Sequence, residues 1–425
     1  MRGVRASVVA TALCLIVATP ATAAPGGLDT SFGTRGWVRH SVARGHDAAF
    51  GVVRTADRKT VVAGTYDDDR SRAHVYLARY LPNGRLDTSF GSRGIVRPTL
   101  GGESVGYELE QLSDGRLLVV GMGRSGHTTG VLAARFAANG QPDRTFGNGG
   151  WLVHAVGRSG LAVPTDAAIG VDGAIGIVGV TFTSSGSLTS FVTRLLPDGK
   201  PDALFGNGTV IDPVPDTVFA AVVVPPDGSV VVGGARVPDD AAPTPFLGRF
   251  LPNAALDPTF GVGLTTMPGT VFNALARTPQ GLIVAAGFGT EQGAAGGSLV
   301  GRVVRFLPSG LLDPTFALGG TASVPAGEAT VLDAVGVDGD GRIVVSGEAA
   351  VGRTSDVVVA RFAVTGLPDA TFGRNGISIQ GTTALHESGF DADVAPDGAV
   401  TVVGAIQPPR PRGAPLDSML TRLLP

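Results

Sequence analysis

Three consecutive carboxylates, Asp67, Asp68 and Asp69, are the first group of side chains in the sequence whose chemistry suits cation binding. Ca²⁺ prefers carboxylate and carbonyl oxygens and takes about six to eight of them. Adjacent carboxylates converge on one ion only if the loop folds back on itself, and the spacing of an EF-hand is absent. A solvated charged loop is the alternative, which the basic residues that follow also fit.

The other residues able to catalyse reactions or bind metals are dispersed. The six histidines show no HxH or HExxH spacing, so a zinc site would need long-range convergence. There is no GxSxG nucleophile elbow and no phosphate-binding glycine loop. The segment from Asp338 to Gly341 resembles the start of a calcium loop, but Ala349 stands where the last acidic ligand belongs. We expect no catalytic residue and no cofactor, and metal binding stays open.

A further set of carboxylates recurs at one position of a repeated motif. LDTSFG occurs at residues 28–33 and 86–91, and variants begin near residues 142, 201, 256, 312 and 368. One aspartate per unit indicates structural symmetry, since an active site would single out one or two, and aspartate there suits an Asx-type turn. The motif aspartates are Asp29, Asp87, Asp143, Asp202, Asp257, Asp313 and Asp369.

An arginine ends an apolar segment in every unit, eight residues before the next motif aspartate. This constant separation spans one strand end and one turn, so we expect each arginine to bind the aspartate that follows it. The last arginine has no aspartate after it, and we expect it to bind Asp29. The arginines are Arg79, Arg135, Arg194, Arg249, Arg305, Arg361 and Arg422.

Internal repetition decides the predicted fold. The motif phenylalanines recur every 55 to 59 residues, and each unit is rich in Val, Ile, Leu and Phe, cut by turn signals. We predict four short strands per unit, in the second unit at about 105–112, 116–121, 131–137 and 151–155. A four-stranded sheet cannot bury both faces alone, so seven such sheets predict an all-β, single seven-bladed β-propeller of four-stranded antiparallel blades. A sandwich or a β-solenoid is the alternative.

The strands at the two ends of the sequence predict how the ring closes. The last unit ends after its third strand, and the stretch Trp37–Ser41 is a fourth strand without a blade of its own. We expect these to pair, so that the N-terminal strand closes the ring and removes two open edges.

The LDxxFG motif, the Asp-Gly turn before an apolar strand ending in glycine, and the period just under 60 resemble the delta-60 repeat. That family occurs in exported bacterial proteins and is similar to NHL-type propellers. The resemblance covers nearly all of residues 28–425. It implies a propeller and implies no substrate.

The first segment is typical of a secretory signal peptide. Arg2 and Arg5 precede an apolar run over residues 6–18, and we expect cleavage after Ala23 to give a secreted or extracytoplasmic chain of residues 24–425. The single cysteine, Cys14, falls inside this segment. The net charge of −3 lacks the positive excess that is typical of proteins that bind nucleic acid. No later apolar run predicts a membrane span.

Two of the four connections in each unit vary in length. They lie on the same side of an up-and-down blade, so the propeller has one constant rim and one variable rim. Variable loops on a rigid frame are a usual place for binding, although neutral drift gives the same pattern. The predicted binding residues on the variable rim are Asp67, Asp68, Asp69, His127, Glu291, Arg410 and Arg412.

The first strand of each unit lines the predicted channel. These strands carry Glu108, Glu110, Asp166, Asn273, Asp333, Asp391 and Asp393. We expect these side chains to hold water, with a bound cation as the alternative. As a whole the sequence predicts an exported, monomeric binding or interaction module for a protein or a carbohydrate. The alternatives are a propeller enzyme acting on a carbohydrate or lactone at the variable rim, and a structural envelope component.

Overall fold

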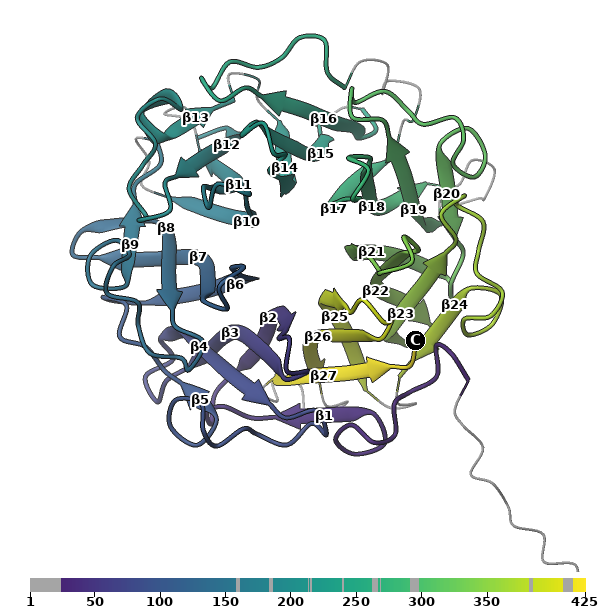
Figure 1. Cartoon of the computed structure of the whole chain (residues 1–425), viewed down its shortest axis with the longest axis horizontal. Coiled ribbons are helices and arrows are strands. Elements are labelled where there is room, and N and C mark those ends of the chain that lie inside the picture. The colour runs from purple at the N-terminus through teal and green to yellow at the C-terminus, as the bar shows by residue number, and fades with distance from the viewer. Residues whose placement is uncertain are drawn as a thin grey trace, which may run out of the picture.

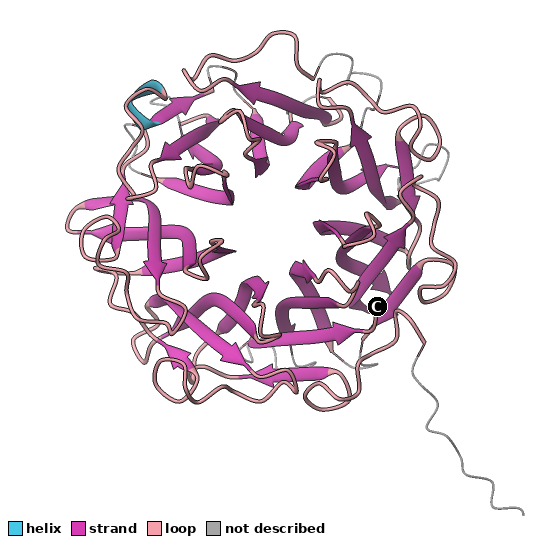
Figure 2. Cartoon of the chain, in the orientation of Figure 1, coloured by secondary structure: helices cyan, strands magenta, loops and turns pink. Residues whose placement is uncertain are grey.

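The computed structural model forms a ring of seven antiparallel sheets around a central axis (Figures 1 and 2). It describes residues 24–425 except 158–160, 183–185, 213, 215, 239–240, 262–266, 268, 291–297, 382–384 and 408–415. The predicted signal peptide lies outside the described residues. The described part contains one short 3-10 helix, Gly206–Gly208, and none of its helices is long and apolar enough to cross a membrane. The predicted all-β, seven-bladed propeller is confirmed.

Each blade places its first strand at the axis and its later strands progressively outward (Figure 1). In blade 4 the described residues form three strands, and in the other six blades they form four. The strands of blades 1 to 7, in sheet order, are β2 (Asp47–Arg54), β3 (Thr60–Asp67), β4 (Ala73–Tyr80), β5 (Ile95–Val96); β6 (Ser104–Gln111), β7 (Leu117–Ser125), β8 (Thr128–Phe136), β9 (Trp151–His154); β10 (Ala162–Ile169), β11 (Ile175–Phe182), β12 (Leu188–Leu195), β13 (Thr209–Ile211); β14 (Thr217–Val223), β15 (Val230–Arg236), β16 (Thr244–Phe250); β17 (Val271–Arg277), β18 (Ile283–Thr290), β19 (Leu299–Phe306), β20 (Thr321–Val324); β21 (Ala329–Val337), β22 (Ile343–Val351), β23 (Thr354–Phe362), β24 (Ile377–Gln380); and β25 (His386–Val394), β26 (Val400–Gln407), β27 (Asp417–Leu423), β1 (Trp37–His40).

In the second blade, the observed strands can be compared with the predicted first and last residues. Its first and fourth strands begin and end within one residue of the expected limits, but β7 and β8 extend further into their hairpin than predicted. Arg124 pairs with Thr129 and Ser125 with Thr128, so the ladder continues to a tight turn. The polar sequence there resembles a loop, but backbone pairing does not require apolar side chains.

The ring closes as predicted, by pairing of the two ends of the chain. Strand β1 is antiparallel to β27, with Trp37 opposite Thr421 and His40 opposite Ser418. An isolated bridge between Leu28 and Leu423 extends the contact. Blade 7 is therefore a complete four-stranded sheet built from both ends of the sequence.

The arginine–aspartate pairs form a ladder around the ring. All seven arginines bind their predicted aspartates, with N···O distances between 2.5 and 3.1 Å. Six of the guanidinium groups also lie over the motif phenylalanine of the same unit, 4.3 to 4.7 Å from the ring centroid. Arg79 donates a further hydrogen bond to the carbonyl oxygen of Ala138 in the next unit. The ladder therefore joins neighbouring blades as well as fixing turns.

The hydrophobic core lies between the faces of neighbouring blades. One cluster, for example, joins Val61 and Leu77 of blade 1 to Leu117 and Phe136 of blade 2. Motif residue Phe90, which is 0% exposed, belongs to the same cluster. The repeated phenylalanine therefore serves packing between blades.

A β-bulge interrupts the first strand of every blade, at the residue opposite the glycine that ends the predicted second strand. In blade 2 the register shifts between Gly106 and Glu108, where Gly121 pairs with Gly106. A Cβ on Gly121 would lie 1.9 Å from the carbonyl oxygen of Val105, and the seven equivalent distances are 1.8 to 2.3 Å. The repeated glycine therefore makes room for the bulge, which re-aims one side chain per blade. The bulged residues are Phe50, Tyr107, Thr165, Ala220, Asn273, Asp333 and Phe390.

Candidate functional site

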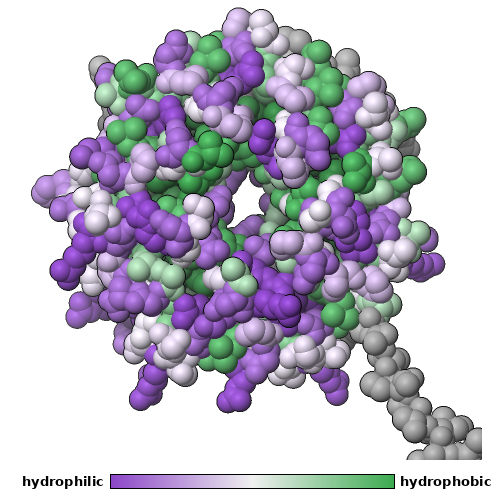
Figure 3. All heavy atoms as spheres, in the orientation of Figure 1, coloured by the Kyte–Doolittle hydropathy of each residue, from purple (hydrophilic) through white to green (hydrophobic). Residues whose placement is uncertain are grey.

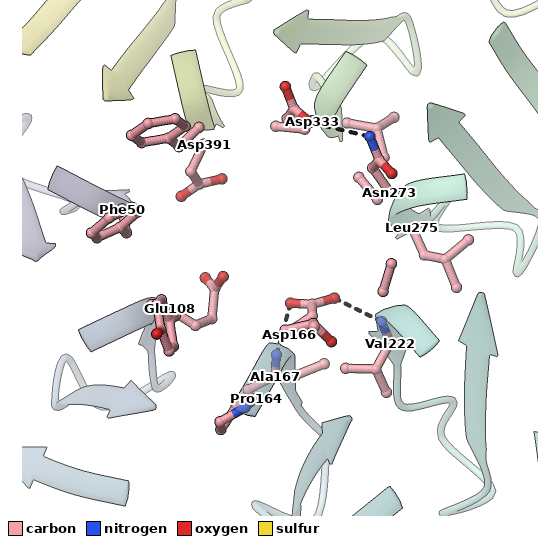
Figure 4. Close-up of a pocket in the computed structure, with 18 of the residues that line it drawn as sticks. Phe50, Glu108, Pro164, Asp166, Ala167, Val222, Asn273, Leu275, Asp333 and Asp391 are labelled. Atoms are coloured by element: carbon pink, nitrogen blue, oxygen red, sulfur yellow. Dashed lines mark hydrogen bonds between the residues drawn. The ribbon is translucent and has the colours of Figure 1, made fainter. Parts of the chain in front are cut away.

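A pocket of about 580 Å³ occupies the axial channel and is lined by the first strands of all seven blades (Figure 4). The space-filling view shows an opening at the centre of the ring (Figure 3). All seven bulged residues line this axial pocket. Apart from Val163 and Pro164, the other lining residues fall within three positions after a bulge, in the half of each strand that leads to the constant rim. The bulges therefore shape the pocket, on the side of the channel away from the variable loops.

The lining of the axial pocket is acidic. Among the described residues, five carboxyl side chains contribute to it, and no lysine, arginine or histidine does. Figure 4 shows the carboxyl groups of Glu108, Asp166 and Asp391 pointing toward the centre from three different blades. The five residues are Glu108, Glu110, Asp166, Asp333 and Asp391.

Burial raises the pKa of these carboxyl groups, because the charged form loses water and its charged neighbours are also negative, and these effects outweigh the hydrogen bonds that some of the groups accept. The pKa of Glu110 rises to about 8, mainly through burial and then through the charges of Asp166, Asp391 and Asp393. That of Asp333 rises to about 7 through burial and the charge of Glu348. The pKa values of Glu108, Asp166 and Asp391 are raised for the same reasons. The axial pocket therefore holds a mixture of protonated and charged groups near neutral pH.

Two of the carboxylates tie neighbouring blades together. Asp391 accepts hydrogen bonds from the backbone N–H of Ala392 (2.7 Å) and of Val52 in the next blade (2.8 Å). Asp166 binds the N–H groups of Ala167 and Val222 in the same way, each at 2.7 Å. Both oxygens of each group are engaged, so these two aspartates serve the scaffold.

Two glutamates keep oxygens facing the pocket without a protein donor. Glu108 accepts one hydrogen bond, 3.0 Å from the N–H of Leu109. Glu110 accepts none from the described residues, although its side chain lines the pocket. Asp333 resembles Glu108, since it accepts one hydrogen bond, of 3.1 Å, from the amide of Asn273. Among the described residues, the unused acceptor capacity of the pocket therefore lies with Glu110, with one oxygen of Glu108 and with one oxygen of Asp333.

Three aromatic side chains form a wall on the same side of the pocket. Phe50 stacks on Phe390 with centroids 5.1 Å apart and an interplanar angle of 17°, and it meets Tyr107 edge-on at 5.9 Å. They are the bulged residues of blades 1, 7 and 2, and Phe390 is 36% exposed. This aromatic wall gives the acidic pocket an apolar surface beside Glu108.

Direct metal coordination has no support in the described part of the chain. No group of three or more His, Cys, Asp or Glu side chains there is arranged to hold a metal ion. The pocket carboxylates come from blades 2, 3, 6 and 7. The arrangement instead suits a larger ligand that meets several carboxyl groups separately.

The predicted rim residues that the structure describes lie in the β3–β4 and β7–β8 hairpins of two neighbouring blades. Asp68 closes the β3–β4 hairpin, accepting hydrogen bonds from the N–H groups of Arg70 and Arg72 and forming an ion pair of 2.6 Å with Arg72. Asp67 ends β3 and Asp69 lies in the hairpin turn, whereas His127 lies in the turn of the β7–β8 hairpin of the next blade. The remaining three, Glu291, Arg410 and Arg412, lie outside the described residues.

The sequence analysis identified the channel acids but missed the aromatic wall. A bulge adds one residue to a strand, so the alternation of inward and outward side chains changes phase at that point. The signal was present in the repeated glycine of the second strand, whose missing side chain marks where the bulged strand approaches.

Comparison with solved structures gives distant likenesses. Virginiamycin B lyase from Staphylococcus aureus is 12% identical, with 91% of this chain and 98% of that chain covered and a TM-score of 0.44. The polysaccharide lyase Uly1 is 11% identical, with 89% and 90% covered and a TM-score of 0.49. Sqt1 from Chaetomium thermophilum is 12% identical, with 90% and 96% covered and a TM-score of 0.44. These likenesses do not bear on what this chain binds.

Comparison of the sequence with known families is more specific. No curated protein matches the chain. The family described as a domain of unknown function, DUF5122 beta-propeller, matches residues 55–90, 112–146, 172–205, 226–260, 279–316 and 339–372. Each match ends at a motif phenylalanine, and the remaining copy of the unit is divided between the two ends of the chain. The chain therefore belongs to a β-propeller repeat family, with six of its units matched by DUF5122.

Proposed function

We propose that the protein is an exported binding module whose small-molecule ligand lies in the axial pocket. The observation that carries this proposal is the cavity of about 580 Å³ in which unpaired glutamate oxygens stand beside a partly exposed aromatic wall. Ligand sites in proteins are concave, largely apolar and supplied with a few convergent polar groups. The axial pocket is concave, combines an apolar wall with several polar groups and is built on the strands of the blades.

Export is supported by the sequence of residues 1–23 and by the resemblance to delta-60 repeats, which we take to be the same kind of unit as the matched family. The expected mature N-terminus is Ala24. Expression in a bacterial host followed by mass measurement of the extracytoplasmic protein tests this. A full-length chain retained in the cytoplasm would contradict it.

The axial pocket is a stronger candidate than the variable rim. The carboxylate of Asp68 is already paired with Arg72 inside its own hairpin, so its charge is largely compensated. In the pocket, no basic side chain compensates the acidic lining. An uncompensated buried charge gains more from a ligand than one that is already paired.

A carbohydrate-processing enzyme is the second candidate, now at the pocket rather than at the rim. The observation in its favour is that burial raises the pKa values of Glu110 and Asp333 to about 8 and about 7. A general acid is most effective when its pKa lies near the pH at which the enzyme operates, here taken as neutral. Incubation with end-labelled oligosaccharides tests this. New chain ends that appear with the native protein and not with Glu110→Gln would establish it, and their absence would remove it.

The binding proposal is tested by filling the axial pocket. Ala220 occupies the bulge position that holds phenylalanine in blades 1 and 7, so Ala220→Phe adds a ring that this position of the repeat accommodates. Calorimetry with choline, spermidine and maltohexaose measures binding to the native chain, Ala220→Phe and the rim variant Asp68→Asn.

We expect at least one of these probes to bind the native chain and to lose affinity at least tenfold in Ala220→Phe, with Asp68→Asn unchanged. Two results would overturn the proposal. One is that none of the probes binds, and the other is that Asp68→Asn weakens binding while Ala220→Phe does not.

A further inference from the structure

We infer that the ligand of the axial pocket is an organic cation, an alkylammonium or a polyamine. Its charged group would lie against Glu108 and Glu110, and its carbon atoms would lie against the aromatic wall of Phe50, Tyr107 and Phe390. This inference rests on the proposed function and adds the chemical class of the ligand.

The sign of the charge follows from the lining. The five carboxyl groups of the pocket face no lysine, arginine or histidine among the lining residues. Arg54, on strand β2, donates its backbone N–H to Asp393 and directs its guanidinium to Asp397 at 3.4 Å. An anion would add repulsion, and a neutral ligand would leave the negative charge uncompensated. A cation relieves the repulsion that burial has created.

The position of the charged group follows from the hydrogen bonds. Asp166 and Asp391 already accept two backbone N–H groups each, and Asp333 accepts the amide of Asn273. Glu108 has one engaged oxygen, and Glu110 accepts no hydrogen bond within the described part of the chain. A donor entering the pocket therefore finds acceptors on these two glutamates and on the second oxygen of Asp333. Of the three, Glu108 and Glu110 belong to strand β6, which also carries Tyr107 of the aromatic wall.

Two observations indicate that the cation is organic. One is the aromatic wall, and the other is that the described residues contain no group of side chains arranged to hold a metal ion. Aromatic faces attract ammonium groups, most strongly where water is excluded. Phe50 and Phe390 stack nearly parallel and line the pocket within the same half of the channel as Glu108. Among the described residues, no three carboxylate or histidine side chains converge as a bare metal ion requires. A cation with a carbon skeleton satisfies both observations.

The test compares choline with its neutral isostere, 3,3-dimethylbutan-1-ol, by calorimetry on the mature chain. The two have similar shape and differ in charge. We expect choline to bind at least tenfold more tightly, and spermidine to compete with it. Equal affinity of the isostere, or tighter binding by Ca²⁺ alone with displacement of choline, would overturn the inference.

Two variants locate the charged and apolar contacts. Glu110→Gln keeps the shape of the side chain and removes its charge, and we expect it to weaken choline at least fivefold while leaving the isostere unchanged. Phe390→Leu keeps an apolar surface and removes the ring, and we expect it to weaken choline more than the isostere. Thermal unfolding confirms that each variant is folded. A folded Glu110→Gln with undiminished choline affinity would contradict the placement of the charge.

The pH dependence of choline affinity provides a further test, because recognition by shape alone would not depend on pH. The carboxyl groups that line the pocket are those of Glu108, Glu110, Asp166, Asp333 and Asp391, with Asp393, Glu348 and Arg54 beside them. The pKa values of Asp391 and Asp393 are raised to about 6, those of Asp166 and Asp333 to about 7 and that of Glu110 to about 8. The pocket therefore becomes more negative between pH 5 and pH 8, so choline should bind more tightly at pH 8 and the isostere should not. A choline affinity that is independent of pH would count against the inference.

The outcomes separate this inference from the proposed function. If maltohexaose binds and is blocked by Ala220→Phe while choline does not bind, the pocket is a binding site and the cation inference is wrong. If none of the probes shows binding that depends on Ala220, both are wrong.

Discussion

Arg422 binds Asp29 across the seam of the ring, with its guanidinium nitrogens 2.7 and 2.8 Å from one carboxylate oxygen, although 393 residues separate the two in sequence. The same guanidinium lies 4.3 Å from the centroid of Phe32. The contact repeats the arginine–aspartate ladder of the other six units. The seam is therefore closed by the ordinary interactions of a blade, and it should respond to mutation as they do.

The first prediction concerns this pair. Asp29→Asn removes the charge that balances a buried arginine, since Arg422 is 7% exposed, and leaving a buried charge unpaired costs about 3 kcal/mol. We expect a matching loss in the free energy of unfolding, measured by urea denaturation. Asp198→Asn, in the exposed pair with Lys200, serves as the control and should leave stability unchanged. Equal effects of the two variants would show that the seam pair contributes no more than a surface pair.

The second prediction concerns the N-terminal strand. Deleting residues 24–45 leaves β27 as an open edge, and such edges promote aggregation. We expect the deleted protein to lose most of its solubility. A circular permutant in which residue 425 is joined to residue 24, with new ends in the β1–β2 connection, keeps blade 7 intact and should remain soluble. Light scattering of both proteins decides the matter, and a soluble, monomeric deletion variant would show that closure is dispensable.

The third prediction concerns the glycine opposite each bulge. Gly121→Ala places a methyl group about 2 Å from the carbonyl oxygen of Val105, so the bulge must shift at a cost of about 2 kcal/mol or more. Gly102→Ala in the same blade meets no atom closer than 3.4 Å and is the matched control. Thermal unfolding should separate the two clearly. If Gly121→Ala proves as stable as the control, close packing against the bulge does not explain the repeated glycine.

The fourth prediction concerns stability as a function of pH. A carboxyl group whose pKa is higher in the folded chain binds its proton more tightly there, so its stabilising effect is present at low pH and is lost as pH rises. The pKa values of Asp393, Asp333 and Glu110 are raised by burial to about 6, 7 and 8. Without ligand, Tm should therefore fall by several degrees between pH 5 and pH 8.

The ladder aspartates act in the opposite sense, which limits stability on the acid side. Burial opposes the shift, but hydrogen bonds from Ser31 and Arg422 lower the pKa of Asp29, so its contribution is lost only as pH falls below about 4. The pocket carboxyl groups begin to lose stability above about pH 4, where the unfolded chain releases their protons, so maximal stability is expected near pH 4. The double variant Glu110→Gln, Asp333→Asn should flatten the fall toward pH 8. An unchanged slope in that variant would exclude the pocket carboxyl groups as its cause.

The features that the sequence predicts well are those that repeat at a fixed spacing. Arg135 and Asp143 are eight residues apart like every other pair, so their contact follows from one strand end and one turn. The closing strand is equally predictable, because Trp37 begins a strand whose blade appears only at the far end of the chain. Here local spacing determines the three-dimensional contact.

The pocket is less predictable because its important residues are those that differ between repeats. Phe50, Tyr107 and Phe390 become neighbours only once the ring is closed, and their inward orientation depends on bulges that period-two patterns do not reveal. Glu110 accepts no hydrogen bond from the described residues, whereas both oxygens of Asp391 are engaged, and this difference depends on which backbone N–H groups the neighbouring blade presents. Neither property is encoded within a single unit.

The most direct measurement is a crystal structure of the mature protein with (2-bromoethyl)trimethylammonium, an analogue of choline in which anomalous scattering from bromine locates the ligand. The account predicts a bromine peak inside the axial pocket, with the ammonium group between Glu108 and the ring of Phe390. A peak only at the variable rim, or no peak at concentrations well above the dissociation constant, would contradict it.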